Sequence, residues 1–371
     1  MLQDHQNWYL QNSQRNATCN RREAELMNTS PGNIPEGKLL ADDRFLRRVA
    51  QLYYEDGQTQ ESIAEMEGCS RQAIGKALQR AKDRGIVHIS VIPEQRTGYL
   101  RNLSRDLRVE LGLEDLVIVA GRNLNEVPVN DTAEDVLADI ATTAADYLDQ
   151  LLTDDDILAV SGGRNIMRNV VRYLKPTKLL PNLQVVPTIG FVEPHTNLGD
   201  SNLIAYDIAT AYGARNAWLP IPAIVETKEQ CEQARSLPLV RDVLKLIERA
   251  NIVMMGLWPT HFNQDLITRG VLPSEQINAL QSRKAVMDIN HWAFDAEGSC
   301  VNDQLPSAPY YLTGLEIPCL RDRIRHDKAK VILVAGASLS YASGIRAALK
   351  AGIVNILITD HVTAQLLMGR E

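Results

Sequence analysis

The stretch TQESIAEMEGCSRQAIGKALQRAKDRGIV, residues 59–87, contains two short helical patterns on either side of a tight turn. Thr59 and Ser70 each stand where a helix N-cap is expected, which predicts helices over Ser62–Met66 and Arg71–Arg84. Two such helices, with polar and cationic residues at the start of the second, are typical of a unit that inserts a helix into the major groove of DNA. An ordinary three-helix bundle with a solvated charged face is the alternative interpretation.

The residues around this stretch complete a small domain, predicted over residues 41–95. A further helix begins at Arg44, because apolar residues recur at helical spacing until Asp56-Gly57. After Gly85, apolar and polar residues alternate over Ile86–Val91, which predicts a β-strand and hence a winged helix-turn-helix. Residues 1–40 are polar, rich in Asn and Gln and without apolar periodicity, which predicts a disordered or mobile arm.

The second helix of the pair has the features of a recognition helix. Arg71 and Gln72, at its start, are the candidates for reading base edges, while Lys76 and Arg80 are better placed to hold phosphates. For Arg71 and Gln72, an ordinary solvated surface is the competing interpretation. The candidate DNA-binding residues are Thr59, Gln60, Ser70, Arg71, Gln72, Lys76 and Arg80.

Composition narrows the class of protein. The formal net charge is -7, but 12 Lys or Arg stand against 8 Asp or Glu between Arg44 and Arg108, so a basic segment lies on an acidic chain. Five scattered cysteines without CxxC spacing indicate neither a disulfide framework nor a zinc site, and no cofactor or metal is expected. The sequence lacks a secretory signal and any apolar run near the roughly 20 residues of a membrane span, so we expect a cytoplasmic protein.

The rest of the chain predicts an α/β domain over residues 116–371. Short β-rich runs alternate with helical segments such as Thr132–Leu152 and Leu239–Ala250, which favours a mainly parallel, doubly wound sheet. A further amphipathic helix at Tyr99–Leu111 is either a linker helix, within residues 96–115, or the first helix of this domain. The β-rich runs are Leu116–Ala120, Ile157–Val160, Gln184–Pro187, Ile252–Met255, Ala285–Ile289, Val331–Ala335 and Val354–Thr359.

Gly and polar residues follow these runs, at the edge of a parallel sheet where ligands bind. In Ser161-Gly162-Gly163-Arg164-Asn165, backbone N–H groups and a helix N-terminus are able to cradle a phosphate or carboxylate. A tight strand-to-helix turn without a ligand is the alternative.

At this point a family resemblance becomes specific. Residues 59–87 resemble the DNA-binding head of the SorC-type sugar-binding transcriptional regulators, and NIVMMG at residues 251–256 and AGIVNILITD at residues 351–360 are similar to their effector domain. The resemblance covers residues 44–368. It implies a fold related to ribose-phosphate isomerases and glucosamine-phosphate deaminases that binds a sugar or sugar phosphate without turnover. The effector-binding residues that it implies are Gly163, Arg164, Asn165, Asp200, Asn202, Arg269, Asp288 and Ser340.

Several positions depart from the pattern of that family. Gly75 stands in the recognition helix where a larger residue is usual, and Asn165 replaces a Thr or Ser. Ala337 and Ser340 replace a Gly and a Lys, so a cationic phosphate partner is exchanged for a neutral hydroxyl. We therefore expect an effector with at most one phosphate, or none, such as a free sugar or polyol.

The resemblance predicts a DNA-binding regulator of a carbohydrate-utilisation operon, acting on double-stranded operator DNA as a homo-dimer or homo-tetramer. A sugar-phosphate isomerase or deaminase is the main rival, because Asp288, His291 and His195 have the chemistry of an acid and a base. A pure interaction adaptor is a third possibility. In the favoured mechanism, effector binding changes the arrangement of two DNA-binding heads.

Overall fold

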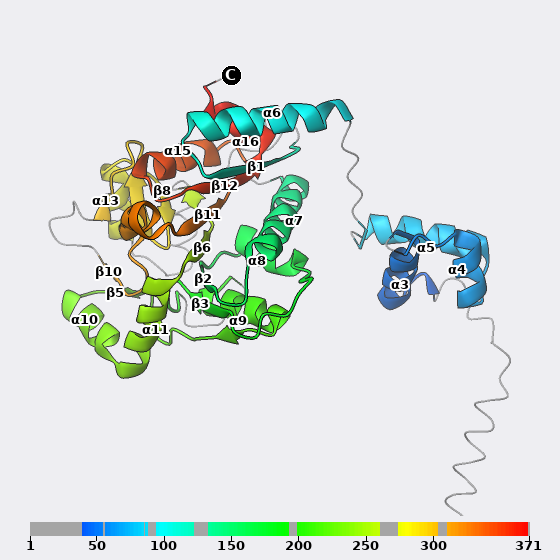
Figure 1. Cartoon of the computed structure of the whole chain (residues 1–371), viewed down its shortest axis with the longest axis horizontal. Helices are drawn as coiled ribbons and strands as arrows, with labels where there is room; N and C mark the ends of the chain where they lie inside the picture. Colours follow the sequence, from blue (N-terminus) through cyan, green and yellow to red (C-terminus); the bar gives the residue numbers. More distant parts are fainter. Residues whose placement is uncertain are drawn as a thin grey trace, which may run out of the picture. The chain divides into compact units, whose positions relative to one another are not determined.

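The computed structural model describes residues 39–54, 56–84, 86–87, 94–121, 133–192, 199–259, 274–302 and 310–369. The chain forms two compact units, one described over residues 39–87 and the other over residues 94–369 (Figure 1). Arg269 and His195, and the arm up to residue 38, lie outside the described residues.

The described part of the first unit includes helices α3 (Asp43–Tyr54), α4 (Gln60–Glu67) and α5 (Arg71–Asp83). The predicted N-caps are confirmed, because Thr59 Oγ1 accepts the Ser62 N–H at 3.1 Å and Ser70 Oγ accepts the Ala73 N–H at 3.1 Å. Gly68 ends α4 in the left-handed conformation that a turn to the next helix requires. The core of this unit is formed by Leu40, Phe45, Leu46, Val49, Ala50, Ile63, Ala64, Ile74, Ala77, Leu78 and Ala81.

The described part of the predicted wing is not a strand. Ile86 and Val87 form a bend in which both N–H groups donate to the Ala81 carbonyl oxygen, and both side chains pack on the helical core. Residues 88–91 of the predicted strand lie outside the described residues.

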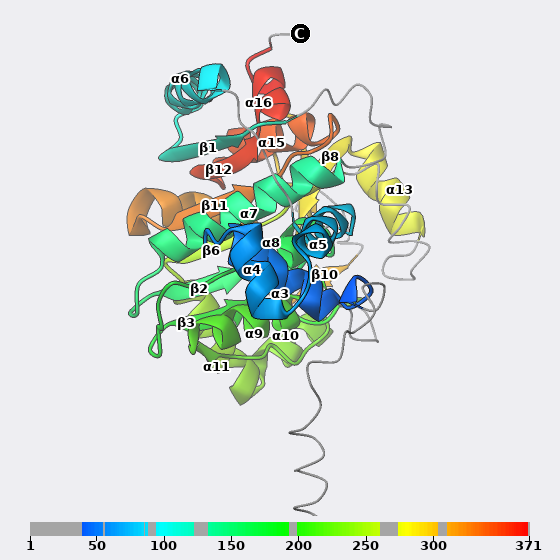
Figure 2. The ribbon, with the colours of Figure 1, turned by 90° about the vertical axis from the view of Figure 1, so that its right-hand side faces the viewer.

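The second unit is built on a seven-stranded sheet in which every neighbouring pair is parallel, in the order β1-β12-β11-β6-β2-β3-β4 (Figure 2). The expected doubly wound parallel sheet is confirmed. Its strands are β1 (Asp115–Val119), β2 (Ile157–Val160), β3 (Gln184–Pro187), β4 (Arg215–Asn216), β6 (Ile252–Met255), β11 (Lys330–Val334) and β12 (Ile356–Asp360).

Helices cover both faces of this sheet. Successive residues of each strand point to opposite faces, so that Val253 packs on one side and Met254 on the other. Helices α6 (Glu94–Glu110), α11 (Pro238–Arg249), α15 (Tyr341–Ala351) and α16 (His361–Leu367) contribute apolar residues to the first core. Helices α7 (Glu134–Leu151), α8 (Ile166–Tyr173) and α9 (Ser201–Tyr212) contribute them to the second.

Helix α6 packs on the sheet unit. Leu103 and Leu107 are buried in its first core, and the Ser104 hydroxyl donates to the Leu116 carbonyl oxygen of β1. The segment was expected to be either a linker helix or the first helix of the large domain. These contacts favour the second interpretation.

One predicted strand of the parallel sheet belongs elsewhere. Residues 285–289 form β8 with the expected bounds, but β8 is the middle strand of a separate antiparallel sheet, β7-β8-β9, with β7 (Trp258–Pro259) and β9 (Trp292–Asp295). The reason is local: only Asn290 and His291 separate β8 from β9, and so short a connection joins antiparallel strands only.

The remaining elements surround these two sheets, and β5 pairs with β10 in an antiparallel ribbon. They are β5 (Ile224–Val225), α10 (Lys228–Ser236), α13 (Ser274–Ser282), β10 (Tyr311–Leu312), η4 (Ile317–Cys319), α14 (Leu320–Asp322) and η5 (Arg323–Asp327). Within the described ranges, none of the helices has the length and apolar character of a membrane span.

Candidate functional site

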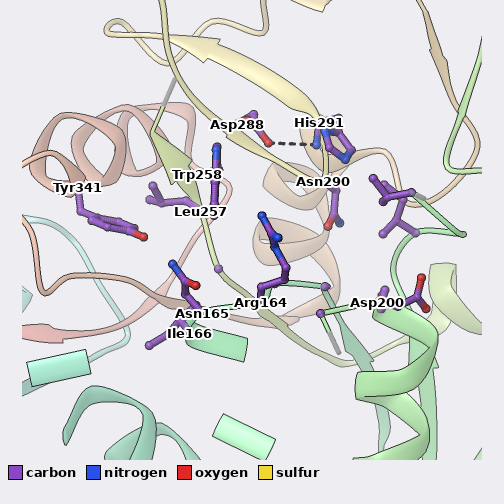
Figure 3. A pocket seen from close by; sticks show the side chains of 17 residues that line it. Arg164, Asn165, Ile166, Asp200, Leu257, Trp258, Asp288, Asn290, His291 and Tyr341 are labelled. Atoms are coloured by element: carbon purple, nitrogen blue, oxygen red, sulfur yellow. Dashed lines mark hydrogen bonds between the residues drawn. The ribbon is translucent and has the colours of Figure 1, made fainter. Parts of the chain in front are cut away.

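A cavity of about 140 Å³ lies beside the carboxyl ends of β2, β3 and β6. A single water needs roughly 10–15 Å³ by the same measure, so the cavity has room for a molecule the size of a sugar. Its wall combines Trp258 of β7 and Asp288 of β8 with residues of the loops that follow β2, β3 and β6, among them the glycine-rich turn after β2 (Figure 3). The position agrees with the general rule for open parallel sheets.

The predicted glycine-rich turn forms one side of this cavity. The Gly163 N–H donates to the Gly199 carbonyl oxygen at 2.8 Å, and a Cβ on Gly162 would lie 2.7 Å from the same oxygen, so only glycine fits there. Gly163 has a φ of 149°, another conformation that favours glycine. Arg164 and Asn165 follow at the start of α8, where the helix N-terminus and the guanidinium favour an anionic ligand group.

Asp200 lies in the cavity wall at the start of α9. It is the N-cap of that helix, since its carboxylate accepts the Asn202 N–H at 2.9 Å, and burial raises the pKa of its carboxyl. Asn202 itself is buried behind the wall, where its Oδ1 accepts the Leu219 N–H at 2.7 Å. Asp200 therefore lines the cavity, whereas Asn202 belongs to the packed residues behind its wall.

Asp288, on β8, is the most deeply buried acid of the cavity wall. Burial raises the pKa of this carboxyl to about 7, although the N–H of His291 donates to its Oδ1 at 3.3 Å. The β-ladder places Asp288 directly opposite Trp258, which also lines the cavity. A carboxyl in this setting changes its charge near neutral pH.

The turn after β8 brings two further side chains into the cavity wall. Asn290 and His291 have φ values of 51° and 64°, so both adopt the left-handed conformation although neither is glycine. That conformation costs on the order of 1 kcal/mol for a residue with a Cβ. Asn290 Nδ2 donates to Thr188 Oγ1 at 2.8 Å, which ties the turn to the end of β3.

The structure thus brings Gly163, Arg164, Asn165, Asp200 and Asp288 together around one cavity. Ser340 is not among the lining residues: its hydroxyl contacts the Ser338 hydroxyl at 3.0 Å just before α15. Arg269 lies outside the described residues.

Ile189, Trp258 and Asn290 belong to the segments after the β-rich runs, where ligand contacts were expected, and they line the cavity. Tyr341 escaped sequence reasoning as a ligand contact, and His291 was considered only as a catalytic candidate. Apolar and aromatic residues at such positions carry no signal that separates a cavity wall from a core.

In the first unit, the candidate DNA-binding side chains gather on the exposed face of α5. Arg71, Gln72, Lys76 and Arg80 are exposed, whereas the opposite face, with Ile74 among its residues, is buried. Arg71 forms a long ion pair of 3.9 Å with Glu61, and both side chains are exposed. Such a pair contributes little to stability, so Arg71 is available for another partner.

The sugar-binding domain family Sugar-bind matches residues 96–369, and the chain belongs to this family, which is that of the SorC-type sugar-binding transcriptional regulators. Membership of this family identifies the chain as a transcription regulator with a sugar-binding domain.

Curated relatives extend over both units. The deoxyribonucleoside regulator of Bacillus subtilis (strain 168) is 28% identical over 326 residues, which cover 86% of this chain and 96% of the relative. The sorbitol operon regulator of Klebsiella pneumoniae is 25% identical and covers 88% of this chain and 98% of the relative. These relatives are regulators and not enzymes.

A solved structure supports the fold of this chain. The full-length sorbitol operon regulator of Klebsiella pneumoniae matches with a TM-score of 0.62 and 23% identity, covering 88% of this chain and 98% of that chain.

Proposed function

We propose that this protein is a cytoplasmic regulator that binds double-stranded operator DNA through α5 and controls a carbohydrate-utilisation operon in response to a sugar, polyol or sugar phosphate. The observation that carries the effector part is the cavity itself, where an anion-favouring turn and buried carboxyls face one another. Relatives named for sorbitol and deoxyribonucleosides support an effector of this class.

The charges of the described wall favour an effector with no more than one phosphate. Arg164 is the one Lys or Arg among the described lining residues, whereas Asp200 and Asp288 are both buried carboxyls. A second phosphate would lie near these carboxyls without a described cation to neutralise it. A free sugar or polyol fits the wall as well as a monophosphate does.

The DNA-binding part rests on Arg71, Gln72, Lys76 and Arg80, with Thr59, Gln60 and Ser70 at the helix starts around them. Thr59 and Ser70 already cap their helices, so we assign base reading to Arg71 and Gln72, and phosphate contacts to Lys76 and Arg80. One small head gives little specificity alone, which favours a homo-dimer or homo-tetramer in which effector binding changes the spacing of the heads.

Fluorescence anisotropy of the full chain on DNA from upstream of its own gene tests this function. The probes are ribose 5-phosphate, sorbitol 6-phosphate, sorbitol and fructose 1,6-bisphosphate. We expect specific DNA binding whose affinity changes at least fivefold with a monophosphate or the free polyol, a coupling common for effectors. Stronger coupling to the bisphosphate would contradict the proposed effector class, and turnover of a sugar phosphate would support the rival enzyme.

A further inference from the structure

The side chain of Tyr341 belongs both to the core and to the cavity wall. Tyr341 is the first residue of α15, it is a member of the first core of the sheet unit, and it is only 5% exposed. It also lines the cavity, and Figure 3 shows its hydroxyl directed toward the side of the cavity on which Asn165 and Arg164 lie. The buried ring therefore carries a polar group into the site.

The hydroxyl of Tyr341 has no hydrogen-bond partner among the residues that the structure describes. Burial raises the pKa of this hydroxyl to about 12, so that it stays protonated at neutral pH and is able to donate. Tyrosine hydroxyls usually find a partner when the residue is buried, and a buried polar group without one costs about 1–3 kcal/mol. The cavity is the place from which a partner for Tyr341 can come.

Tyr310 shows how the fold treats a tyrosine of similar burial. This residue is 3% exposed, and its hydroxyl donates to the His291 carbonyl oxygen at 2.8 Å and accepts Asn302 Nδ2 at 3.1 Å. Both hydrogen bonds are made within the protein. The contrast between the two tyrosines lies in their surroundings, because Tyr341 lines the cavity and Tyr310 does not.

We infer that the Tyr341 hydroxyl is a specificity-determining group of the effector site, which donates a hydrogen bond to an oxygen atom of the bound sugar, polyol or sugar phosphate. This inference rests on the proposed function, and it names one residue that reads the oxygens of the ligand. Among the described lining residues, Tyr341 is the one that α15 contributes, whereas the hydroxyl of Ser340 contacts that of Ser338. A site that hydrogen-bonds a ligand oxygen rejects analogues that lack it.

The test compares the variants Tyr341→Phe and Tyr310→Phe in the full chain. Y341F removes the hydroxyl and keeps the ring, so without ligand we expect it to unfold at the wild-type temperature or above it. Y310F removes a hydroxyl that is bonded within the protein, and we expect it to unfold at a lower temperature. By calorimetry, Y341F should bind the probes that wild type binds at least fivefold more weakly, which is the effect of one lost hydrogen bond.

The choice of probes shows which oxygen Tyr341 contacts. The probes are sorbitol, sorbitol 6-phosphate and ribose 5-phosphate. A similar loss for sorbitol and sorbitol 6-phosphate would assign the contact to a hydroxyl of the carbon skeleton. A loss confined to the two phosphorylated probes would assign it to a phosphate oxygen, and either pattern supports the inference.

Two results would overturn the inference while the proposed function stands. In the first, Y341F unfolds at a lower temperature than wild type, which would show that the hydroxyl has a structural partner. In the second, Y341F binds every probe as tightly as wild type, which would show that the hydroxyl does not contact the ligand. Failure of the proposed effector class is different, because the wild-type protein would then bind none of the probes, and the inference would fail with it.

Discussion

At the scale of single residues, Asp288 has the clearest physical consequence. Burial raises the pKa of its carboxyl from 3.8 to about 7, so between these values the folded protein holds a proton that the unfolded chain has lost. This residue therefore favours the folded state at low pH, and that contribution is lost as the pH rises toward 7. The upper bound of this contribution to the free energy of unfolding is on the order of 4 kcal/mol, since each unit of pKa difference corresponds to about 1.4 kcal/mol.

The variant Asp288→Asn isolates this effect. We expect its stability relative to wild type to increase as the pH rises from 5 to 7 and to level off above that, in urea unfolding of the ligand-free protein. A difference that stays constant across this range would show that Asp288 is already ionised in the folded state at pH 5.

Asp149 provides a control of opposite sign. Its burial alone would raise the pKa, but the hydroxyl and N–H of Thr177 donate to the carboxylate, and the pKa of Asp149 is lowered as a result. Its stabilising contribution is present above the unfolded pKa and is lost as the pH falls through the folded value. The variant Asp149→Asn should therefore lose most stability near neutral pH and least in acid.

At the scale of elements, the recognition helix contains a built-in weakness at Gly75. This glycine lies in the interior of α5, and a Cβ there would meet only Gln60 Oε1, at an ordinary 3.7 Å. Gly75→Ala should stabilise α5 by about 0.5–1 kcal/mol, because glycine loses more backbone entropy than alanine in a helix. Slower amide hydrogen exchange of α5 in the full chain is the measurement.

Gly68→Ala serves as the matched variant. Gly68 ends α4 with a φ of 63°, where a side chain is strained whatever the space around it, so this change should accelerate exchange in α4 and α5. If both alanine variants change exchange in the same direction, backbone conformation is not what governs the stability of the head.

Much of this element structure was predictable from the sequence. The bounds of β2, β3, β6 and β8 agree with the apolar runs, because short β-rich runs between glycine and polar residues carry a strong local signal. The pairing of β8 was not predictable from its apolar run, because such a run is equally compatible with a parallel and with an antiparallel sheet. The two-residue turn at Asn290-His291 was the missing information.

The candidate site divides in the same way. Glycines and polar residues after a strand revealed the turn at Gly163 and Arg164, and Asp288 followed from the family resemblance. Tyr341 was missed, because an aromatic residue in a cavity wall has the same local pattern as one in a core. The family resemblance implied Ser340 as an effector-binding residue, but its side chain is not among those that line the cavity and contacts Ser338 instead.

At the scale of the whole molecule, the two proposed tasks, DNA binding and effector binding, belong to different units. The exposed face of α5 lies in the first unit and the cavity in the second, so each task has residues that the other does not use. Regulation then requires that occupancy of the cavity alter the affinity of the first unit for DNA, a coupling of two sites in one free-energy cycle.

The most direct test of this account measures the affinity for DNA and for a sugar or polyol ligand in two variants of the full chain. The double variant Arg71→Ala with Gln72→Ala should lose at least tenfold in operator affinity by anisotropy and keep wild-type ligand affinity by calorimetry. Arg164→Ala should keep operator affinity without ligand and lose the response of DNA binding to ligand. If R164A abolishes DNA binding without ligand, or if the α5 variant binds operator like wild type, the division of tasks between α5 and the cavity is wrong.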